Sequence, residues 1–268
     1  MEIKKELRGL GISSRLVVSR EKSLSAVIVK KEKVIDFIIT EKIIGKTCAV
    51  QEFEEYSKRD YKRPRSDARS GMLPPKLARI MVNLAGNNRD KIILDPFCGS
   101  ATLLMEAMTV GYNKIIGSDL SKKAVEDSKL NMDWLASELK LDNPNYQIYN
   151  IDVKNISQKL DSSSIDVIST EPYLGPPISG NEDEKQITGI KKDLEKLYIS
   201  SFTEFKKILK PKGKIVIVFP SWHINNKIYK LDIEKNIYQL GFKRLDKDRL
   251  VYKREKQKVW RNITIWQK

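Results

Sequence analysis

The stretch from Lys91 to Asp119 constrains the fold of this chain more than any other. It begins with a short apolar run that ends on Asp95, passes through the tight turn Pro96–Ser100, and continues with a helical spacing of apolar residues. A second short apolar run ends on Asp119. This order of strand, turn, helix and strand predicts a βαβ unit. Both aspartates then lie at the carboxyl ends of parallel strands, where open α/β sheets bind ligands.

The turn after Asp95 indicates which kind of ligand the unit binds. A dinucleotide fingerprint needs three glycines so that the backbone can approach a pyrophosphate, but here only Gly99 matches, and Ala101 and Leu104 occupy the other two positions. The acid that opens the turn repels a pyrophosphate and suits a positive charge, such as the amino and sulfonium groups of S-adenosylmethionine. Asp119 could accept hydrogen bonds from ribose hydroxyls. A βαβ unit without a cofactor is the alternative interpretation.

The letters D-P-F-C-G-S from Asp95 resemble motif I of the class I methyltransferases, in particular the D-P-F-C-G-S-G-T form of RNA and DNA amino-methyltransferases. The sequence departs from this form at Ala101, where glycine is usual. The resemblance implies S-adenosylmethionine as cofactor and a Rossmann-like α/β fold, with a seven-stranded, mostly parallel sheet and a C-terminal antiparallel hairpin. It also implies a set of cofactor-binding residues, namely Asp95, Phe97, Gly99, Ser100, Thr102, Asp119, Leu120 and Asp152. Asp152 follows the strand-like run 146–151, and a helix N-cap is the alternative to a contact with the adenine amino group.

A second motif follows the apolar strand pattern that begins at Ile165. Methylation of an exocyclic amine needs acceptors that hold its N–H groups and a ring that fixes the plane of the base. The sequence T-E-P-Y-L-G-P-P resembles motif IV, [D/N]-P-P-[Y/F], in a variant found among relatives of the guanine-N2 enzymes. Counting from the strand assigns the acid of the motif to Glu171, which we prefer, and counting back from Tyr173 assigns it to Thr170. The resemblance implies a catalytic set of Glu171, Pro172, Tyr173 and Thr170; a loop without chemistry is the alternative.

The phrase R-P-R-S-D-A-R-S-G-M-L-P-P-K-L-A-R-I-M-V-N-L-A, from Arg63, resembles the lead-in to the catalytic domain of the tRNA guanine-N2 methyltransferases. Pro75 suits the first turn of a helix, because the N–H that it lacks has no partner there. The helix should bury one stripe of apolar side chains, Leu77, Ile80, Met81 and Leu84. We place three charged residues near the substrate entrance, with solvated linker charges as the alternative: Arg65, Asp67 and Arg69.

The sequence predicts three parts: residues 1–50, a charged linker at 51–70 and a methyltransferase domain at 71–268. The first part begins with a helical pattern at 2–10 and forms a small α/β piece. Its strand-like runs are 14–18, 24–29 and 34–39. The order G-I-S-S-R-L-V-V-S-R, followed by I-I-G-K-T-C-A-V-Q-E-F-E-E-Y, resembles the last part of a THUMP RNA-binding domain. This piece is therefore a truncated THUMP-like module that binds RNA, or else packs on the catalytic domain.

The end of the chain continues the α/β pattern. Residues 181–190 are polar and predict a mobile loop, and the apolar run 214–220 predicts a central strand. Other expected elements are helices at 122–139 and 191–209, a further helix within 221–240, and hairpin strands at 249–252 and 262–266. The basic segment 253–261 contains one aromatic residue, so it is either a phosphate-contacting tip or a solvated hairpin.

Charge and composition narrow the range of possible functions further. The net charge is +15 over 268 residues; the centre of the chain is acidic and both ends are basic. This pattern suits a polyanion held around a cofactor pocket, although a lysine-rich solvated surface gives the same count. With two cysteines and one histidine, no metal site is expected. The charged start and the lack of a long apolar run predict a cytoplasmic protein without a membrane segment.

The family resemblance implies methyl transfer from S-adenosylmethionine to the N2 amine of a guanine in tRNA. The expected partners are tRNA and either another protein or a second copy of this chain that supplies RNA-binding surface. Two alternatives remain open. One is an amino-methyltransferase of adenine or cytosine in DNA, and the other is a non-catalytic RNA-binding protein with a methyltransferase fold.

Overall fold

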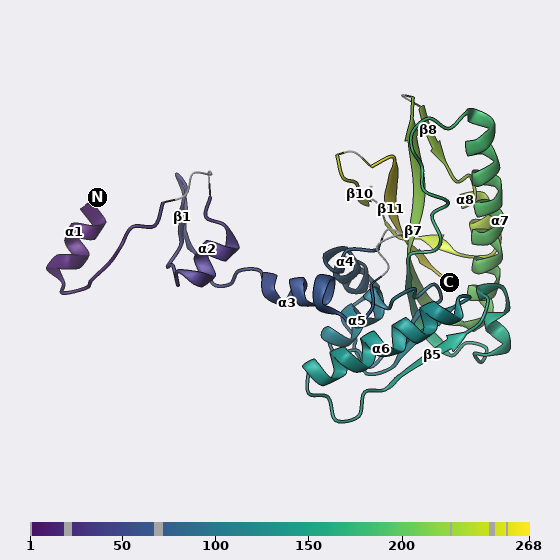
Figure 1. Cartoon of the computed structure of the whole chain (residues 1–268), viewed down its shortest axis with the longest axis horizontal. Helices are drawn as coiled ribbons and strands as arrows, with labels where there is room; N and C mark the ends of the chain where they lie inside the picture. The colour runs from purple at the N-terminus through teal and green to yellow at the C-terminus, as the bar shows by residue number, and fades with distance from the viewer. Residues whose placement is uncertain (1, 19–22, 67–71, 226, 247–249, 256) are drawn as a thin grey trace. The chain divides into compact units, whose positions relative to one another are not determined.

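The computed structural model describes residues 2–18, 23–66, 72–225, 227–246, 250–255 and 257–268 (Figure 1). The chain divides into two compact units, Met1–Ser57 and Lys58–Lys268. Some predicted residues lie outside the described part, namely Asp67 and Arg69 of the substrate entrance, Asn226 of the segment 221–240, Arg249 of a hairpin strand and Lys256 of the basic segment.

The described residues of the smaller unit form three short helices and one hairpin. Its elements are α1 (Glu2–Gly9), α2 (Ala26–Lys31), β1 (Phe37–Ile39), β2 (Ile44–Lys46) and α3 (Phe53–Ser57). The helix predicted at 2–10 is confirmed as α1. The strand predicted at 24–29 is wrong, because the Ser25 side chain accepts a hydrogen bond from the backbone N–H of Ile28 and caps α2. Residues 14–18 form neither helix nor strand, and none of the described residues of this unit is buried.

The larger unit alternates strands and helices up to β7 and ends with antiparallel strands. Its first half contains η1 (Lys58–Lys62), α4 (Pro75–Ala85), β3 (Ile93–Asp95), α5 (Thr102–Thr109), β4 (Ile115–Asp119), α6 (Lys122–Glu138), β5 (Tyr146–Asn150) and η2 (Val153–Gln158). Its second half contains β6 (Ile165–Thr170), α7 (Glu184–Ile208), β7 (Leu209–Ile224), β8 (Lys227–Lys230), α8 (Glu234–Gln239), β9 (Lys243–Arg244), β10 (Leu250–Tyr252) and β11 (Val259–Gln267).

The main sheet has the strand order β10-β11-β7-β6-β3-β4-β5, with β8 added beside β7 and β9 beside β11. The five strands β7, β6, β3, β4 and β5 are parallel to one another, and β11 runs antiparallel between β7 and β10. The prediction of a mostly parallel seven-stranded sheet that ends in an antiparallel hairpin is therefore confirmed.

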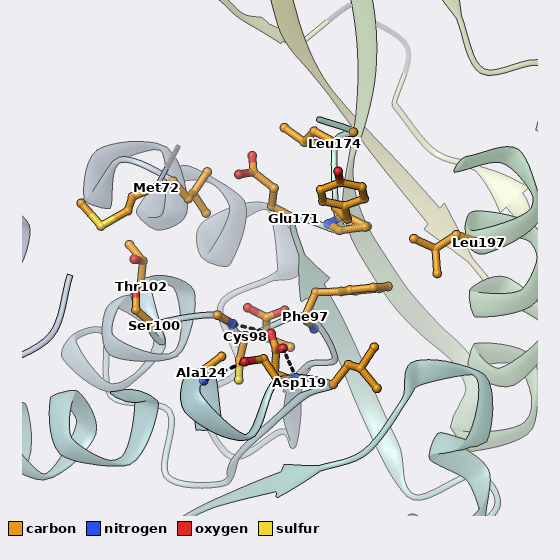
Figure 2. A pocket seen from close by; sticks show the side chains of 18 of the residues that line it. Met72, Phe97, Cys98, Ser100, Thr102, Asp119, Ala124, Glu171, Leu174 and Leu197 are labelled. Atoms are coloured by element: carbon orange, nitrogen blue, oxygen red, sulfur yellow. Dashed lines mark hydrogen bonds between the residues drawn. The ribbon is translucent and has the colours of Figure 1, made fainter. Parts of the chain in front are cut away.

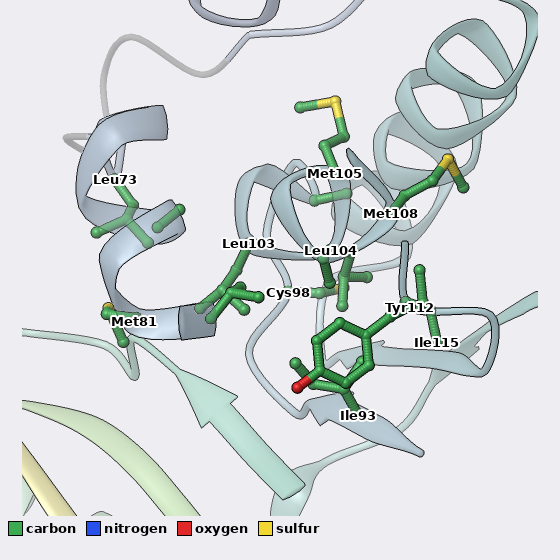
Figure 3. Packing of buried hydrophobic residues seen from close by; sticks show 14 of the residues in the cluster. Leu73, Met81, Ile93, Cys98, Leu103, Leu104, Met105, Met108, Tyr112 and Ile115 are labelled. Atoms are coloured by element: carbon green, nitrogen blue, oxygen red, sulfur yellow. The ribbon is translucent and has the colours of Figure 1, made fainter. Parts of the chain in front are cut away.

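Helices cover both faces of this sheet (Figure 1). Because successive strand residues point to opposite faces, Ile93 belongs to one buried cluster and Leu94 to the other. The first cluster packs against α4, α5 and α6, and Figure 3 shows part of it. The second cluster packs against α7 and α8. The two helical layers cover the faces of the sheet, and the candidate site forms at the carboxyl ends of its parallel strands.

Two elements begin or end elsewhere than predicted because local capping and strand pairing prevail. Helix α7 starts at Glu184, inside the predicted mobile loop, because Asp183 and Gln186 form a reciprocal capping box. The segment 221–240 holds the predicted helix, α8, but this helix occupies only Glu234–Gln239, because β7 continues to Ile224 and β8 follows it. Pairing with β11 reaches Trp222, and this pairing outweighs the helical propensity of the segment.

The predicted buried stripe of α4 is only partly correct. Leu77 and Met81 are buried and Leu84 is half-buried, but Ile80 is exposed. Small or branched residues face the sheet instead, namely Ala78, Val82 and Ala85. Pro75 is the first helical residue, as predicted.

Candidate active site

One pocket of the larger unit, with a volume of about 1090 Å³, opens at the carboxyl ends of β3, β4 and β6 (Figure 2). It is lined by all eight predicted cofactor residues: Asp95, Phe97, Gly99, Ser100, Thr102, Asp119, Leu120 and Asp152. Of the predicted catalytic residues, Glu171, Pro172 and Tyr173 also line it. Thr170 lies behind them and is buried. The two motifs, more than 50 residues apart in the sequence, therefore share one cavity.

Asp95 is the last residue of β3 and is almost completely buried. Its Oδ1 accepts hydrogen bonds from the backbone N–H of Phe97 (3.1 Å) and from the Thr170 hydroxyl (2.6 Å). Burial raises the pKa of Asp95 to about 7, and the negative charges of Asp119 and Glu171 act in the same direction, against the two hydrogen bonds. A cationic ligand would relieve this excess of negative charge, so the carboxylate fits an amino or sulfonium group.

Asp119, the last residue of β4, organises the turn that follows β3. Its Oδ2 accepts from the N–H of Gly99 at 3.0 Å and its Oδ1 accepts from the N–H of Ser121 at 2.9 Å (Figure 2). Gly99 has φ +52°, in the left-handed region that favours glycine. Each carboxylate oxygen retains a second lone pair, so Asp119 can also accept hydrogen bonds from a ligand.

Helix α6 supports the turn from its buried side, and the sequence did not reveal this contact. The Ser128 hydroxyl donates to the Gly99 carbonyl at 2.6 Å, and the Asn131 amide donates to the Ser100 carbonyl at 2.8 Å. Asn131 also exchanges two hydrogen bonds with the backbone of Arg65. The predicted linker is thereby tied to the turn that forms the pocket.

The linker contributes buried charges to the same unit. Arg59 donates to Glu106 of α5 at 2.5 Å, and Arg79 of α4 donates to the other oxygen of Glu106 at 2.6 Å. Arg63 is buried and donates to the Thr102 hydroxyl at 2.6 Å, and burial lowers its pKa. These contacts fix the position of α5, whose first residue, Thr102, lines the pocket. The periodicity of the local sequence does not predict them.

The other cofactor residues lie as follows. The side chain of Asp152 accepts from the N–H of Lys154 and caps η2, which agrees with the N-cap interpretation, and it lines the pocket as well. Leu120 is largely exposed, and Phe97 packs against the second buried cluster. An N-cap role and a ligand contact are therefore compatible at Asp152.

The turn after β6 places its acid beside a basic residue that we had assigned to the hairpin tip. Arg261, in β11, donates to both carboxylate oxygens of Glu171. Burial raises the pKa of Glu171, while Arg261 acts in the opposite direction. Tyr173 is 57% exposed and lines the pocket, so its ring is accessible for stacking. Arg261 is thus part of the pocket wall, and a phosphate-contacting role of the segment 253–261 stays a prediction.

Among the described residues, no three histidine, cysteine or acidic side chains gather in a way suited to a metal ion. Every helix in the described ranges is too short or too polar to cross a bilayer.

The strand order and the pocket at the strand ends define an α/β protein of the methyltransferase type. TrmN from Thermus thermophilus has a similar fold, with a TM-score of 0.55 and 18% identity over 84% of this chain and 56% of that one. Residues 62–244 match the RMKL-like methyltransferase domain, so the chain belongs to this family. The match begins after residue 61, so the resemblance of residues 1–50 to a THUMP module stays a prediction.

Two curated relatives are tRNA (guanine(10)-N2)-dimethyltransferases. The protein of Pyrococcus abyssi is 29% identical over 173 residues, which are 64% of this chain and 44% of the relative. The protein of Methanocaldococcus jannaschii is 29% identical over 193 residues, or 69% of this chain and 50% of the relative. The chain spans about half the length of these relatives.

Proposed function

We propose that this chain transfers a methyl group from S-adenosylmethionine to the exocyclic N2 amine of a guanine in tRNA. The observation that carries the proposal is the hydrogen bond between Thr170 and Asp95. It joins the end of β6 to the end of β3, so that the acid suited to a cationic cofactor and the turn suited to a planar base face one cavity. The family and the two tRNA guanine-N2 enzymes similar to this chain support the same reaction.

The cofactor half of the proposal assigns one role to each acid. S-adenosylmethionine, when bound, supplies a methyl group carried by a sulfonium sulfur. We assign the amino group of the cofactor to Asp95, its ribose hydroxyls to Asp119 and its adenine amine to Asp152. The negative charge around Asp95 supports the first assignment, because Asp119 and Glu171 both raise the pKa of that carboxyl.

The base half of the proposal concerns Glu171, Pro172 and Tyr173. The lone pair of an exocyclic amine is delocalised into the base, so the amine must be held by acceptors and turned towards the methyl group. Glu171 supplies the acceptor oxygens, and the exposed ring of Tyr173 supplies a stacking surface for a base taken out of its stack. Positioning and electrostatic orientation then supply most of the lowering of the barrier.

We further propose that another protein or a second copy of this chain completes the RNA-binding surface. The hairpin of the smaller unit supports this step, because Phe37, Ile38, Ile39 and Ile44 are all exposed. Exposed apolar side chains that lie together are typical of surfaces that contact another macromolecule. The basic flanks of the chain supply charge for phosphate contacts.

Transfer of tritiated methyl groups to unmodified bulk tRNA, followed by nucleoside analysis, tests the proposal. We expect the label in N2-methylguanosine. Label in N6-methyladenine or N4-methylcytosine when DNA is the acceptor, with none in tRNA, would replace RNA by DNA as substrate. Cofactor binding without transfer to either acceptor would refute an enzymatic function for the chain alone.

A further inference from the structure

The ion pair between Glu171 and Arg261 lies in the wall of the pocket, next to the aromatic ring assigned to the base. Arg261 Nε lies 2.5 Å from Glu171 Oε2, and Arg261 Nη2 lies 3.1 Å from Glu171 Oε1. The side chains are 8% and 13% exposed, and both residues line the cavity. Since β7 lies between β6 and β11 in the sheet, the arginine side chain spans a strand to reach the turn.

A two-point contact of this kind fixes both the charge and the orientation of the carboxylate. A guanidinium group stays protonated and presents its N–H donors in a rigid plane, so it favours the ionised form of the carboxyl group against the effect of burial and fixes its orientation. Each carboxylate oxygen has two lone pairs, and the arginine uses one on each oxygen. Glu171 therefore offers the cavity two neighbouring acceptors and no donor.

The pairing edges of the bases differ in a way that such a carboxylate can read. Guanine has two adjacent donors, the N1–H and the 2-amino group. Adenine and cytosine instead have an amino donor next to a ring nitrogen that is an acceptor. When adenine or cytosine faces an ionised carboxylate, the lone pair of this ring nitrogen points at a lone pair of the carboxylate, and the two repel each other. A site built around a hydrogen bond rejects an analogue that lacks the matching group by a large factor.

We propose that Glu171 selects guanine by accepting hydrogen bonds from N1–H and from the 2-amino group, and that Arg261 is the positioning residue that holds it there. This inference rests on the proposed function and adds to it the atoms by which the base is recognised. Counted back from Tyr173, the motif [D/N]-P-P-[Y/F] has a proline at position 171. A proline there could not accept these hydrogen bonds, so the inference gives Glu171 a role that the usual motif residue could not perform.

The base 2-aminopurine separates recognition of N1–H from recognition of the amine. It keeps the 2-amino group of guanine, but its N1 is an acceptor. The test uses tRNA assembled by ligation, with guanosine or 2-aminopurine at the position that ribonuclease fragment mapping of the labelled tRNA has identified as methylated. For the wild type, we expect kcat/KM to be at least about 100-fold higher with guanosine. Comparable values for the two bases would overturn the inference.

Glu171→Gln is the matched substitution, because its amide can donate to N1 of 2-aminopurine while accepting from the 2-amino group. The readout is the ratio of the two kcat/KM values, which is independent of the fraction of folded protein. We expect the ratio to fall at least about 10-fold. An unchanged ratio would refute the role of Glu171. Glu126→Gln, an exposed acid of α6, is the control and should keep the wild-type ratio.

Arg261→Lys tests the positioning role, because lysine keeps the charge but lacks the planar fork. We expect a lower kcat with guanosine and a lower guanosine-to-2-aminopurine ratio, at an unchanged dissociation constant for S-adenosylmethionine. A purely structural role would reduce the yield of folded protein and leave the ratio as it is. If the wild type labels no guanosine, the proposed function fails and this inference fails with it; label with an unchanged ratio refutes the inference alone.

Discussion

Binding of S-adenosylmethionine to this pocket should release one proton from Asp95. The pKa of this carboxyl is about 7 in the free protein because the group is buried and has negative neighbours. The neutral form therefore dominates below pH 7, and a cationic amino group binds the ionised form. Well below pH 7, each further pH unit lowers the affinity about tenfold, or about 1.4 kcal/mol. Half of the carboxyl groups are ionised at pH 7, so between pH 7 and pH 5.5 the dissociation constant should rise about 16-fold.

Isothermal titration calorimetry from pH 5.5 to 7.5 measures this dependence, and two buffers of different ionisation enthalpy count the proton released. The range stays below the pKa of an α-amino group, about 8, so that the ligand keeps its charge. Asp95→Asn should bind more weakly and with little dependence on pH, whereas the exposed control Asp90→Asn should behave like the wild type. A wild-type dissociation constant that changes less than twofold over this range would refute the assignment of the amino group to Asp95.

The same carboxyl sets a pH dependence of stability with the opposite sign. Because the folded pKa lies above that of the unfolded chain, the folded protein binds more protons between about pH 4 and pH 7. Its contribution to the free energy of unfolding is present below pH 4 and is lost as pH rises through 7. The loss is on the order of 4 kcal/mol for about three pH units. In urea denaturation at pH 8, Asp95→Asn without cofactor should therefore be more stable than the wild type.

Three further predictions concern other residues of the unit. Asp119→Ala leaves the N–H of Gly99 without its acceptor and should weaken cofactor binding at least about tenfold by calorimetry; an unchanged affinity removes Asp119 from the site. Tyr173→Ala should lower kcat on tRNA at least about tenfold while the affinity for cofactor changes less than twofold, and an unaffected rate argues against stacking. Glu106→Ala removes the acid that pairs with two arginines and should cost about 3–5 kcal/mol in urea denaturation. A loss below about 1 kcal/mol would mean that the arginines find other partners.

The sheet and the acids at its strand ends could be predicted because their signals are local. A short apolar run that ends on Asp95, a turn and an apolar helix fit within 29 residues, and strands of this kind pair side by side. Asp119 follows from the same unit. Their place at the carboxyl edge of the sheet is a consequence of parallel topology and needs no long-range contact to be inferred.

The contacts that hold the site together could not be predicted in this way. Arg261 is 90 residues from Glu171, and Asn131 is 66 residues from Arg65. Such pairs depend on which side chains the sheet and helices bring together, and no periodicity marks them. Within the segment 221–240 a helix could be predicted but its short length could not, because pairing with β11 extends β7 into the start of this segment.

Ala101 replaces a glycine that is usual in the motif, so it bears on whether the site can still bind its cofactor and catalyse methyl transfer. The structure gives it φ +66°, a left-handed conformation that costs an alanine about 1–2 kcal/mol. Its methyl group is fully buried in the first cluster, and burial of one methyl group offsets about 0.8 kcal/mol of that cost. In this turn Gly99 donates to Asp119, and α5 begins directly after Ala101. The substitution therefore alters the stability of the turn slightly and leaves the backbone groups of the pocket in place, which argues against a decayed site.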